Sequence, residues 1–355
     1  MRITGSFVQN RLCSRYPMND SDVHDREALK DLLCELFGFA TVTKIELVYE
    51  RYRCLNYRIS TPNQEYFLKQ YRGRSSEEVF ETKFAEQFFS ENEIPILLPV
   101  KDRFQRPAFK YADEWFSLFD FVHAKQPDSQ HLTDTFLASL GAQLAKLHRV
   151  GSLVRLDSFR RLRLWDEEEF VFEVVELNTL LEQEQEKSGV PSLVFETLEK
   201  KMKFVTQCQR TAKDFTLPFD CLLHGDPIYQ NTFINDADQV IALFDLEDTC
   251  VGPRAYEVSR AILINCFERG WGDQEFHQAR TFFRAYQHVY PISFEEFQQG
   301  VEMYMIKNAH KLWFEVKHLF DGGEEIKRCY EAHANRIRHL TDNWEPFCRS
   351  IYTAG

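Results

Sequence analysis

The sequence predicts an α+β fold, with a small antiparallel β lobe followed by a large, mainly α-helical lobe. Before residue 120, short segments alternate apolar and polar residues, as antiparallel strands with one buried face do. Beyond residue 125, the apolar residues recur mainly at helical spacing. The 355 residues suffice for two lobes, which we place at 20–119 and 120–355, after a disordered extension at 1–19.

The composition is that of a globular protein, and it disfavours several kinds of partner. Hydrophobic residues make up 44% of the chain and charged residues 28%. The net charge of −12 argues against nucleic-acid binding, which needs a basic surface. No apolar run approaches the ~18 residues of a membrane span, and nine scattered cysteines without a Cys-x-x-Cys pair favour reduced thiols. We therefore expect a cytoplasmic protein that binds neither nucleic acid nor membrane.

The elements of the first lobe follow from their spacing. Residues 20–38 predict a helix, ended by Gly38, with apolar residues at helical spacing: Leu29, Leu32, Leu33, Leu36 and Phe37. The alternating segments KIELVYERY, LNYRIST and EYFLKQY then predict three antiparallel strands.

The next segment, SSEEVFETKFAEQFFSENEIP, predicts a helix capped by a serine. Phe80, Phe84 and Phe88 fall four residues apart, which predicts that they form its buried face. Two further strands in PAFKYADEWFSLFDFV flank a turn at residues 112–113.

The second lobe is mainly helical, with one exception. DTFLASLGAQLAKLHRVG places four leucines on one helical face, and the chain beyond Ala255 is helical throughout. Between these helices, NTFI and QVIALFD flank turn residues 235–238 and predict a short hairpin. A symmetric turn predicts that Asn231 lies opposite Ala242.

Three oxygen-bearing side chains are predicted to converge at one end of this hairpin. Asp226, in LLHGDPIYQN, lies on the loop leading in, Asn231 begins the hairpin, and Asp245 follows its second strand. Mg²⁺ prefers such hard oxygen ligands, and phosphoryl transfer by kinases uses a loop Asp, then an Asn and a second Asp. The alternative is an Asx-rich surface turn, which the position of Asp245 at the end of an apolar strand disfavours.

A phosphotransferase also needs a cation for the nucleotide phosphates. Lys69 lies on the last strand before the predicted helix, where kinases place such a lysine, paired with a helix glutamate. Glu81 is the expected partner, because it lies beside Phe80 and Phe84 on the side predicted to be buried. The alternatives are a solvent-facing strand lysine and an exposed helix acid.

Together these motifs resemble the aminoglycoside phosphotransferase and choline kinase-like superfamily of small-molecule kinases. HGDPIYQN is similar to its catalytic loop, ALFDLEDTCVGPRAYEVSRA to its metal-binding strand and the segment that follows, and LNYRIST and YFLKQYR to its nucleotide-binding strands. The resemblance implies a protein-kinase-like bilobal fold. Residues 20–119 would form the nucleotide-binding lobe, and residues 120–355 the catalytic and substrate-binding lobe.

The resemblance also implies roles for the matched residues of the hairpin region. Asp226 would orient and deprotonate the substrate hydroxyl, while Asn231 and Asp245 would hold Mg²⁺. His224 would support the loop through hydrogen bonds.

On the nucleotide side, the resemblance implies that Lys69 contacts the phosphates of ATP, with Glu81 as its partner. The segment LFDFVH would be the hinge between the lobes. The backbone of Asp120 and Val122 would then hydrogen-bond adenine.

The sequence thus favours an ATP-dependent kinase for a hydroxyl group of a small metabolite, such as an amino acid, an amino alcohol or an amino sugar. An acidic acceptor site that includes Glu247 and Asp248 would suit a cationic substrate. The alternative is a nucleotide-binding pseudokinase that acts through protein contacts, favoured by the absence of glycine at residues 51–55. A protein kinase is disfavoured because Gly-Pro begins only seven residues after Asp245. The acceptor and the oligomeric state stay open.

Overall fold

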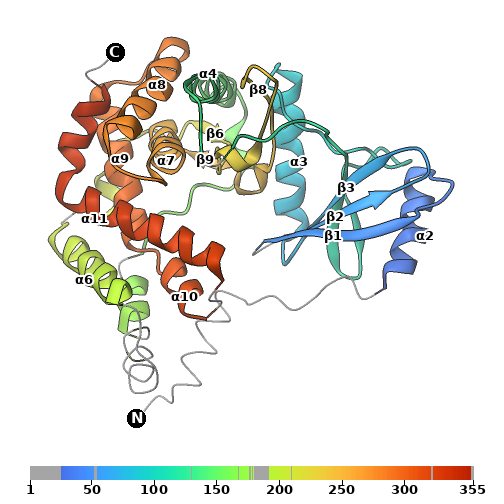
Figure 1. Ribbon diagram of the computed structural model, residues 1–355, viewed down its shortest axis with the longest axis horizontal. Helices are drawn as coiled ribbons and strands as arrows, with labels where there is room; N and C mark the ends of the chain where they lie inside the picture. The colour runs from blue at the N-terminus through green and yellow to red at the C-terminus, as the bar shows by residue number, and fades with distance from the viewer. Residues whose placement is uncertain are drawn as a thin grey trace.

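The protein folds into a five-stranded sheet from its N-terminal third and a larger assembly of helices from the rest of the chain (Figure 1). The computed structural model describes residues 25–51, 54–128, 130–166, 168–175, 177, 179, 192–208, 210–320 and 323–352. The extension predicted at residues 1–19 lies outside the described residues.

The N-terminal sheet has the strand order β1-β2-β3-β5-β4, and every neighbouring pair is antiparallel. Its strands are β1 (Lys44–Arg51), β2 (Cys54–Ser60), β3 (Glu65–Tyr71), β4 (Phe109–Tyr111) and β5 (Glu114–Asp120). Ala112 and Asp113 in the last turn have φ of 47° and 67°, as a two-residue hairpin turn requires. All five strands lie where the alternating segments predict them.

Helix α2 (Arg26–Phe37) packs against this sheet. Asp25 caps its first turn by accepting the Ala28 N–H at 2.9 Å, and Gly38 ends it in the left-handed conformation. Its buried leucines lie in one hydrophobic cluster with residues of β1, β2, β3 and β5. Leu32 and Phe37 are partly buried against the same cluster, so the predicted apolar face is confirmed, with Leu29, Leu33 and Leu36 at its centre.

Helix α3 (Ser76–Glu91) lies between the sheet and the helices (Figure 1), and its buried face is not the predicted one. Phe80 and Phe84 are 40% and 56% exposed, so the prediction of a buried phenylalanine face is wrong. The helix carries apolar residues on two faces, and spacing alone does not identify the face that meets the protein. The buried side chains are Val79, Thr82, Lys83, Ala85, Glu86 and Phe89.

The helical part has one large core and two short antiparallel strand pairs, β6-β9 and β7-β8. Helix α4 packs along α8, and α7 packs along α9. The strands are β6 (Cys221–Leu223), β7 (Thr232–Ile234), β8 (Val240–Leu243) and β9 (Cys250–Gly252). The helices are α4 (Asp134–Gly151), α6 (Ser192–Gln207), α7 (Arg254–Phe267), α8 (Asp273–Val289), α9 (Phe294–Ala309), α10 (Trp313–Phe320) and α11 (Glu324–Tyr352).

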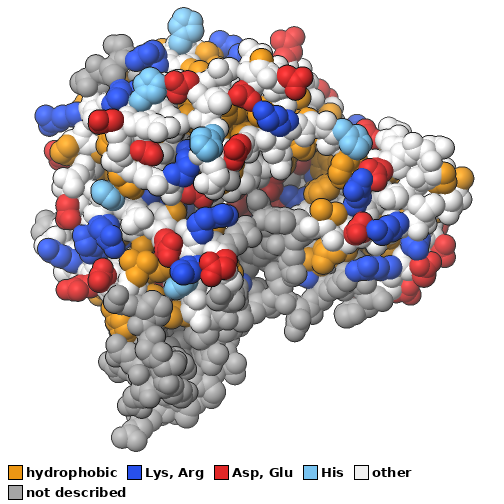
Figure 2. All heavy atoms as spheres, viewed as in Figure 1, with side chains coloured by type: hydrophobic (Ala, Val, Ile, Leu, Met, Phe, Trp, Pro, Cys, Tyr) orange, Lys and Arg blue, Asp and Glu red, His pale blue; other side chains and the backbone are white. Residues whose placement is uncertain are grey.

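The surface carries charge of both signs. On the face shown in Figure 2, acidic and basic side chains are interspersed over the sheet and the helices. Within the described residues, no helix combines the length and the apolar character that crossing a membrane requires. A cytoplasmic location and the lack of nucleic-acid binding stay predictions.

The predicted hairpin forms, but its register is shifted by two residues. Thr232 pairs with Leu243, and the Phe244 N–H donates to the Asn231 oxygen at 3.1 Å. Asn231 therefore lies opposite Phe244, and the predicted pairing with Ala242 is wrong.

The turn explains this shift. Asn235 Oδ1 accepts the N–H groups of Ala237 and Gln239 at 3.0 and 2.9 Å, and Asp238 has a φ of 56°. Such an Asx turn with a left-handed residue is longer and less symmetric than a two-residue turn. As a result, Asp245 directly follows the residue opposite Asn231.

Candidate active site

The loop that carries Asp226 follows β6 and turns sharply at Gly225. Gly225 has a φ of 94°, and a Cβ at this position would lie 2.1 Å from the backbone oxygen of Asp248. Only glycine combines this backbone conformation with so close an approach. The Gly of His-Gly-Asp thus brings the loop against the segment that follows Asp245.

Glu257 of α7 holds the start of this loop. Its carboxylate accepts the N–H of His224 at 3.0 Å and that of Gly225 at 2.5 Å. His148 Nε2 lies 2.8 Å from the same carboxylate, and His148 Nδ1 lies 2.8 Å from the Tyr286 hydroxyl. Burial acts to raise the pKa of Glu257, but the hydrogen bond and charge of His148 lower it overall. Since a carboxylate only accepts, His148 Nε2 is the donor.

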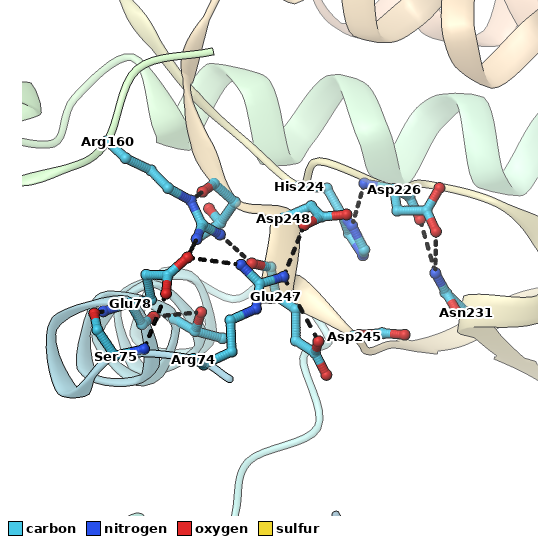
Figure 3. Close-up of polar contacts among 12 residues, drawn as sticks. Arg74, Ser75, Glu78, Arg160, His224, Asp226, Asn231, Asp245, Glu247 and Asp248 are labelled. Carbon is cyan, nitrogen blue, oxygen red and sulfur yellow. Dashed lines mark hydrogen bonds and ion pairs between the residues drawn. The ribbon is translucent and has the colours of Figure 1, made fainter. Parts of the chain in front are cut away.

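Asp226 itself is held by several neighbours, of which Figure 3 shows Asn231 and His224. Asn231 Nδ2 donates to the Asp226 backbone oxygen at 3.0 Å and to Oδ2 at 3.2 Å. Arg260 of α7 forms an ion pair with Oδ1, and the Asp226 N–H donates to His224 Nδ1 at 3.3 Å. The Asp226 side chain remains 22% exposed, so it can reach a substrate while its direction is fixed.

Helix α7 contributes two further supports that the sequence analysis does not identify, Arg260 and Asn265. Asn265 is fully buried, its Oδ1 accepts the Tyr229 N–H at 2.8 Å, and its Nδ2 donates to the Pro227 oxygen at 3.1 Å. Together with Glu257, these polar residues recur at near-helical spacing on a mostly buried helix. That periodicity is the signal that could have found them, because buried polar groups need partners.

Asp245 follows β8 beside Asn231 with a left-handed backbone, φ 66° and ψ 56°. Non-glycine residues adopt this conformation rarely, and such residues are concentrated at functional sites. Its carboxylate lies 2.7 Å from Lys69 Nζ, and Lys69 also pairs with Glu247. The structure thus brings Lys69, Asn231, Asp245 and Asp226 into one region.

The predicted ion pair between Lys69 and Glu81 is not formed among the described residues. The acid of α3 that turns inward is Glu86, whose two oxygens lie 2.9 and 3.0 Å from Lys83 Nζ. Burial raises the pKa of Glu86, while the charges of Lys83 and Lys69 act against this. The prediction of Glu81 depends on a buried phenylalanine face. Because α3 buries a different face, the buried acid of this helix is Glu86.

The sheet side of the site is the group of charged residues around Lys69 and Asp245. Within it, Arg74, just before α3, contacts the segment after Asp245 (Figure 3). Its Nη1 lies 3.0 Å from Glu78 Oε1, and its Nη2 lies 3.0 Å from Asp248 Oδ1. Arg160 Nη1 lies 3.4 Å from the same Glu78 oxygen, and its Nε donates to the Thr249 oxygen at 2.8 Å. These contacts fix the segment after Asp245 against the start of α3.

The predicted hinge follows β5. The Phe121 N–H donates to the Glu65 oxygen at 3.3 Å. Because backbone groups alternate in direction along an antiparallel strand, those of Asp120 point to the edge of β5 away from β3. Strand β4 pairs with that edge only as far as Phe116. This geometry is compatible with backbone contacts from Asp120 and Val122 to a base, which stay a prediction.

The oxygen donors at Asn231 and Asp245 fit Mg²⁺. Asn231 donates to Asp226 through Nδ2, so its Oδ1 would be the atom to hold a metal, and Asp245 would add a carboxylate. Mg²⁺ is typically held by one or two protein groups together with waters and substrate phosphates. Among the described residues, no group of three or more His, Cys, Asp or Glu could hold a metal. The ion would therefore need the phosphate oxygens as ligands too.

The five-stranded antiparallel sheet and the mainly helical part together form a kinase-like fold. The profile of the phosphotransferase enzyme family matches residues 46–296, and the chain belongs to this family of small-molecule kinases. The predicted fold class and family resemblance are thus confirmed. A comparison with curated proteins finds no match.

Solved structures with low sequence identity share the fold over most of the chain. An amicoumacin kinase, in complex with AMP-PNP, Ca²⁺ and Ami, is 13% identical with a TM-score of 0.65, over 94% of this chain and 96% of that one. A microcompartment-associated aminopropanol kinase is 15% identical with a TM-score of 0.63, over 91% and 98%. A spectinomycin phosphotransferase, in complex with ADP and spectinomycin, is 12% identical with a TM-score of 0.55, over 93% and 98%.

Proposed function

We propose that this protein transfers the γ-phosphate of ATP to a hydroxyl group of a small molecule, with Asp226 as the catalytic base. The observation that carries the proposal is the fixed direction of Asp226, between Asn231 on one side and Arg260 on the other. Structurally similar proteins in complex with AMP-PNP or ADP support ATP as the donor.

In this proposal, each side of the site has its own task. Asp226 accepts the proton of the acceptor hydroxyl as the oxygen attacks phosphorus. Lys69 exchanges its contacts with Asp245 and Glu247 for phosphate oxygens. Asn231 and Asp245 hold Mg²⁺, which when bound neutralises charge on the phosphates.

The nucleotide would lie between the two lobes. Residues 20–119 would supply Lys69 and the hinge, where the backbone of Asp120 and Val122 would hydrogen-bond adenine. Residues 120–355 would supply the catalytic loop and the acceptor site. The Phe121 contact to Glu65, which turns the Asp120 backbone outward, supports this assignment.

The test is Mg²⁺-dependent ADP formation from ATP with a panel of small alcohols. Asp226→Asn should lower kcat by about 10²- to 10⁴-fold, since general-base catalysis contributes that much. Asp236→Asn is the matched control, because it removes the same charge from the exposed tip of the neighbouring hairpin. ATP binding without turnover of any compound would favour the pseudokinase, and absence of ATP binding would overturn the proposal.

A further inference from the structure

We propose that the phosphate acceptor carries an anionic group, a carboxylate or a phosphate, that binds Lys307 and Lys311 beside the Arg260–Asp226 pair. The inference rests on the proposed kinase activity, since it names the chemical class of the molecule phosphorylated. It also reverses the expectation of an acidic acceptor site for a cationic substrate.

The acids expected to receive a cationic acceptor are already engaged. Glu247 pairs with Lys69 and lies 3.8 Å from Arg74. Asp248 lies 3.0 Å from Arg74. Glu247 would lose Lys69 to the phosphates when ATP binds but would still lie beside Arg74, and Asp248 keeps its pair with Arg74. Arg74 therefore competes with any ammonium group on the acceptor for both carboxylates.

The opposite side of Asp226 is basic. Arg260 comes from α7, Lys307 from α9 and Lys311 from the turn before α10, so all three belong to the helical part (Figure 1). Lys307 Nζ donates to the backbone oxygen of Arg163. Lys311 Nζ lies 5.6 Å from the ring centroids of both Trp313 and Phe314.

Neither lysine has a carboxylate partner. Among the described residues, no Asp or Glu oxygen lies within 4.0 Å of Lys307 Nζ or Lys311 Nζ. Burial and then the charge of Lys311 lower the pKa of Lys307 to about 8. Desolvation by the surrounding protein and then the charge of Arg260 lower the pKa of Lys311 to about 8, although solvent still reaches this side chain. Asp248 and Asp226 offset only part of this effect on Lys311, and a bound anion would relieve the remaining repulsion.

Solvent still reaches these groups. Lys311 is exposed, while Lys307 and Arg260 are partly exposed. Both lysines lie at the C-terminal end of α9, where a dissolved anion can reach them. Lys311 also lies within electrostatic range of Asp226, which places this site next to the catalytic base.

A second layer of positive charge lies behind Lys311. Lys201 Nζ donates to the Lys311 backbone oxygen at 2.8 Å and pairs with Glu315 at 2.5 Å. Arg336 is only 7% exposed, and its Nε and Nη1 have no hydrogen-bond partner among the described residues. Burial, and then the charges of Lys201, Arg336 and Lys311, hold the pKa of His333 well below its usual value. Glu315 neutralises Lys201, so Arg336 of α11 is the group that adds positive charge to this layer.

An anion docked on the lysines would direct a nearby hydroxyl of the same molecule toward Asp226. The hydroxyl oxygen forms a bond to the γ-phosphorus, the bond from that phosphorus to the β–γ bridging oxygen breaks, the proton passes to Asp226, and ADP leaves. Arg260 binds Asp226 through Nη2, and a guanidinium has five N–H donors. Arg260 can therefore contact Asp226 and the acceptor together.

The first test compares acceptor classes. The panel contains hydroxy acids, sugar phosphates, neutral polyols, amino alcohols and amino sugars, each with ATP and Mg²⁺. We expect turnover with a hydroxy acid or a sugar phosphate, and the better of these two distinguishes carboxylate from phosphate recognition. Turnover confined to neutral or cationic acceptors would overturn the inference and leave the proposed kinase intact.

The second test uses variants. Lys307→Gln and Lys311→Gln should each raise the KM of the anionic acceptor about 10- to 100-fold, the usual worth of a charge-assisted hydrogen bond. The KM of ATP should not change, and Lys311→Arg should retain most of the affinity. Lys203→Gln on α6 is the control, because it removes an exposed lysine elsewhere on the helical part. If the acceptor KM of Lys307→Gln and of Lys311→Gln changes no more than that of Lys203→Gln, the inference is overturned.

A third measurement separates this inference from the proposed activity. Inorganic phosphate is titrated by calorimetry into protein saturated with AMP-PNP and Mg²⁺, so that the nucleotide phosphates already occupy their own site. If phosphate binds the unmodified protein but not the Lys307→Gln, Lys311→Gln double variant, the anion site is supported. This holds even if none of the acceptors in the panel is phosphorylated. Binding that is absent, or unchanged in the double variant, overturns it.

Discussion

The two sides of the candidate active site hold their charged groups in different ways. On the loop side, Glu257 is 1% exposed and accepts hydrogen bonds from His148 and from two backbone N–H groups. Asn265 is likewise bonded to the backbone of the loop. Each of these partners belongs to the protein, so this side is complete without a ligand.

On the sheet side, the charges pair with one another. Lys69 contacts Asp245 and Glu247, and Arg74 contacts Asp248. In the proposed function, Lys69 and Asp245 bind phosphate and Mg²⁺, so their mutual contacts must be exchanged when the nucleotide arrives. The difference implies that loop-side substitutions act first on stability, whereas sheet-side substitutions act first on nucleotide affinity.

The largest expected effect is on the loop side. Glu257→Ala should lower the free energy of unfolding by about 3–5 kcal/mol, because removing one partner of a buried charged network leaves the others unpaired. Urea denaturation followed by circular dichroism measures it. Glu295→Ala, at an exposed position of α9, is the control and should change stability by less than ~0.5 kcal/mol. A similar small loss for both variants would contradict the proposed difference between the two sides.

Gly225→Ala tests the point at which the two sides meet. The φ of 94° and the 2.1 Å approach to the Asp248 oxygen should together cost about 2–3 kcal/mol. Activity should also fall, because the strain lies next to Asp226. Gly323→Ala is the control, since a Cβ there meets no atom within 4 Å. Unchanged stability and kcat in Gly225→Ala would show that the loop relaxes freely, and the two sides would then be independent.

Local sequence patterns predict the fold and much of the loop. The five strands, the leucine face of α2 and the order of Asp226, Asn231 and Asp245 depend on residues close in sequence, so periodicity and turn chemistry suffice. The register of the hairpin is wrong by two residues because an Asx turn at Asn235 depends on side-chain hydrogen bonds that a symmetric turn ignores.

The contacts that the sequence does not predict are made between distant segments. Choosing Glu86 over Glu81 requires knowing which face of α3 meets the sheet, and both faces carry apolar residues. Arg260 contacts Asp226 across 34 positions of sequence. The basic group brings Arg260 of α7 together with Lys307 and Lys311 at the end of α9, and the overall net charge of −12 hides it.

Lys69→Met should lower nucleotide affinity more than stability, the opposite of what we expect for Glu257→Ala. We expect the affinity for AMP-PNP with Mg²⁺ to fall about 10- to 100-fold, since Lys69 would contribute a charge-assisted contact to phosphate. Stability without nucleotide should change less than in Glu257→Ala. Calorimetric titration measures the affinity, and Lys44→Met on β1, whose lysine side chain is 61% exposed, is the control. Equal affinities in the two variants would remove Lys69 from the nucleotide site.

The smallest effect concerns the pH dependence of acceptor binding. The titratable and charged groups nearest the two lysines are Arg163, Lys201, Asp226, Asp248, Cys250 and Arg260. Because the pKa of Lys307 and of Lys311 is lowered to about 8, both lose their proton as the pH rises through that value.

The KM of a carboxylate acceptor should therefore be flat below pH 7 and rise about tenfold by pH 9, following the loss of one proton from one essential lysine. The acceptor carboxylate stays ionised over this range, so its own titration does not contribute. Replacing both lysines by arginine should flatten the profile, because guanidinium groups stay protonated. The KM of ATP, measured in the same assays, should show no such rise. A rise that persists in the double arginine variant would assign the titration to another group and place the anion away from these lysines.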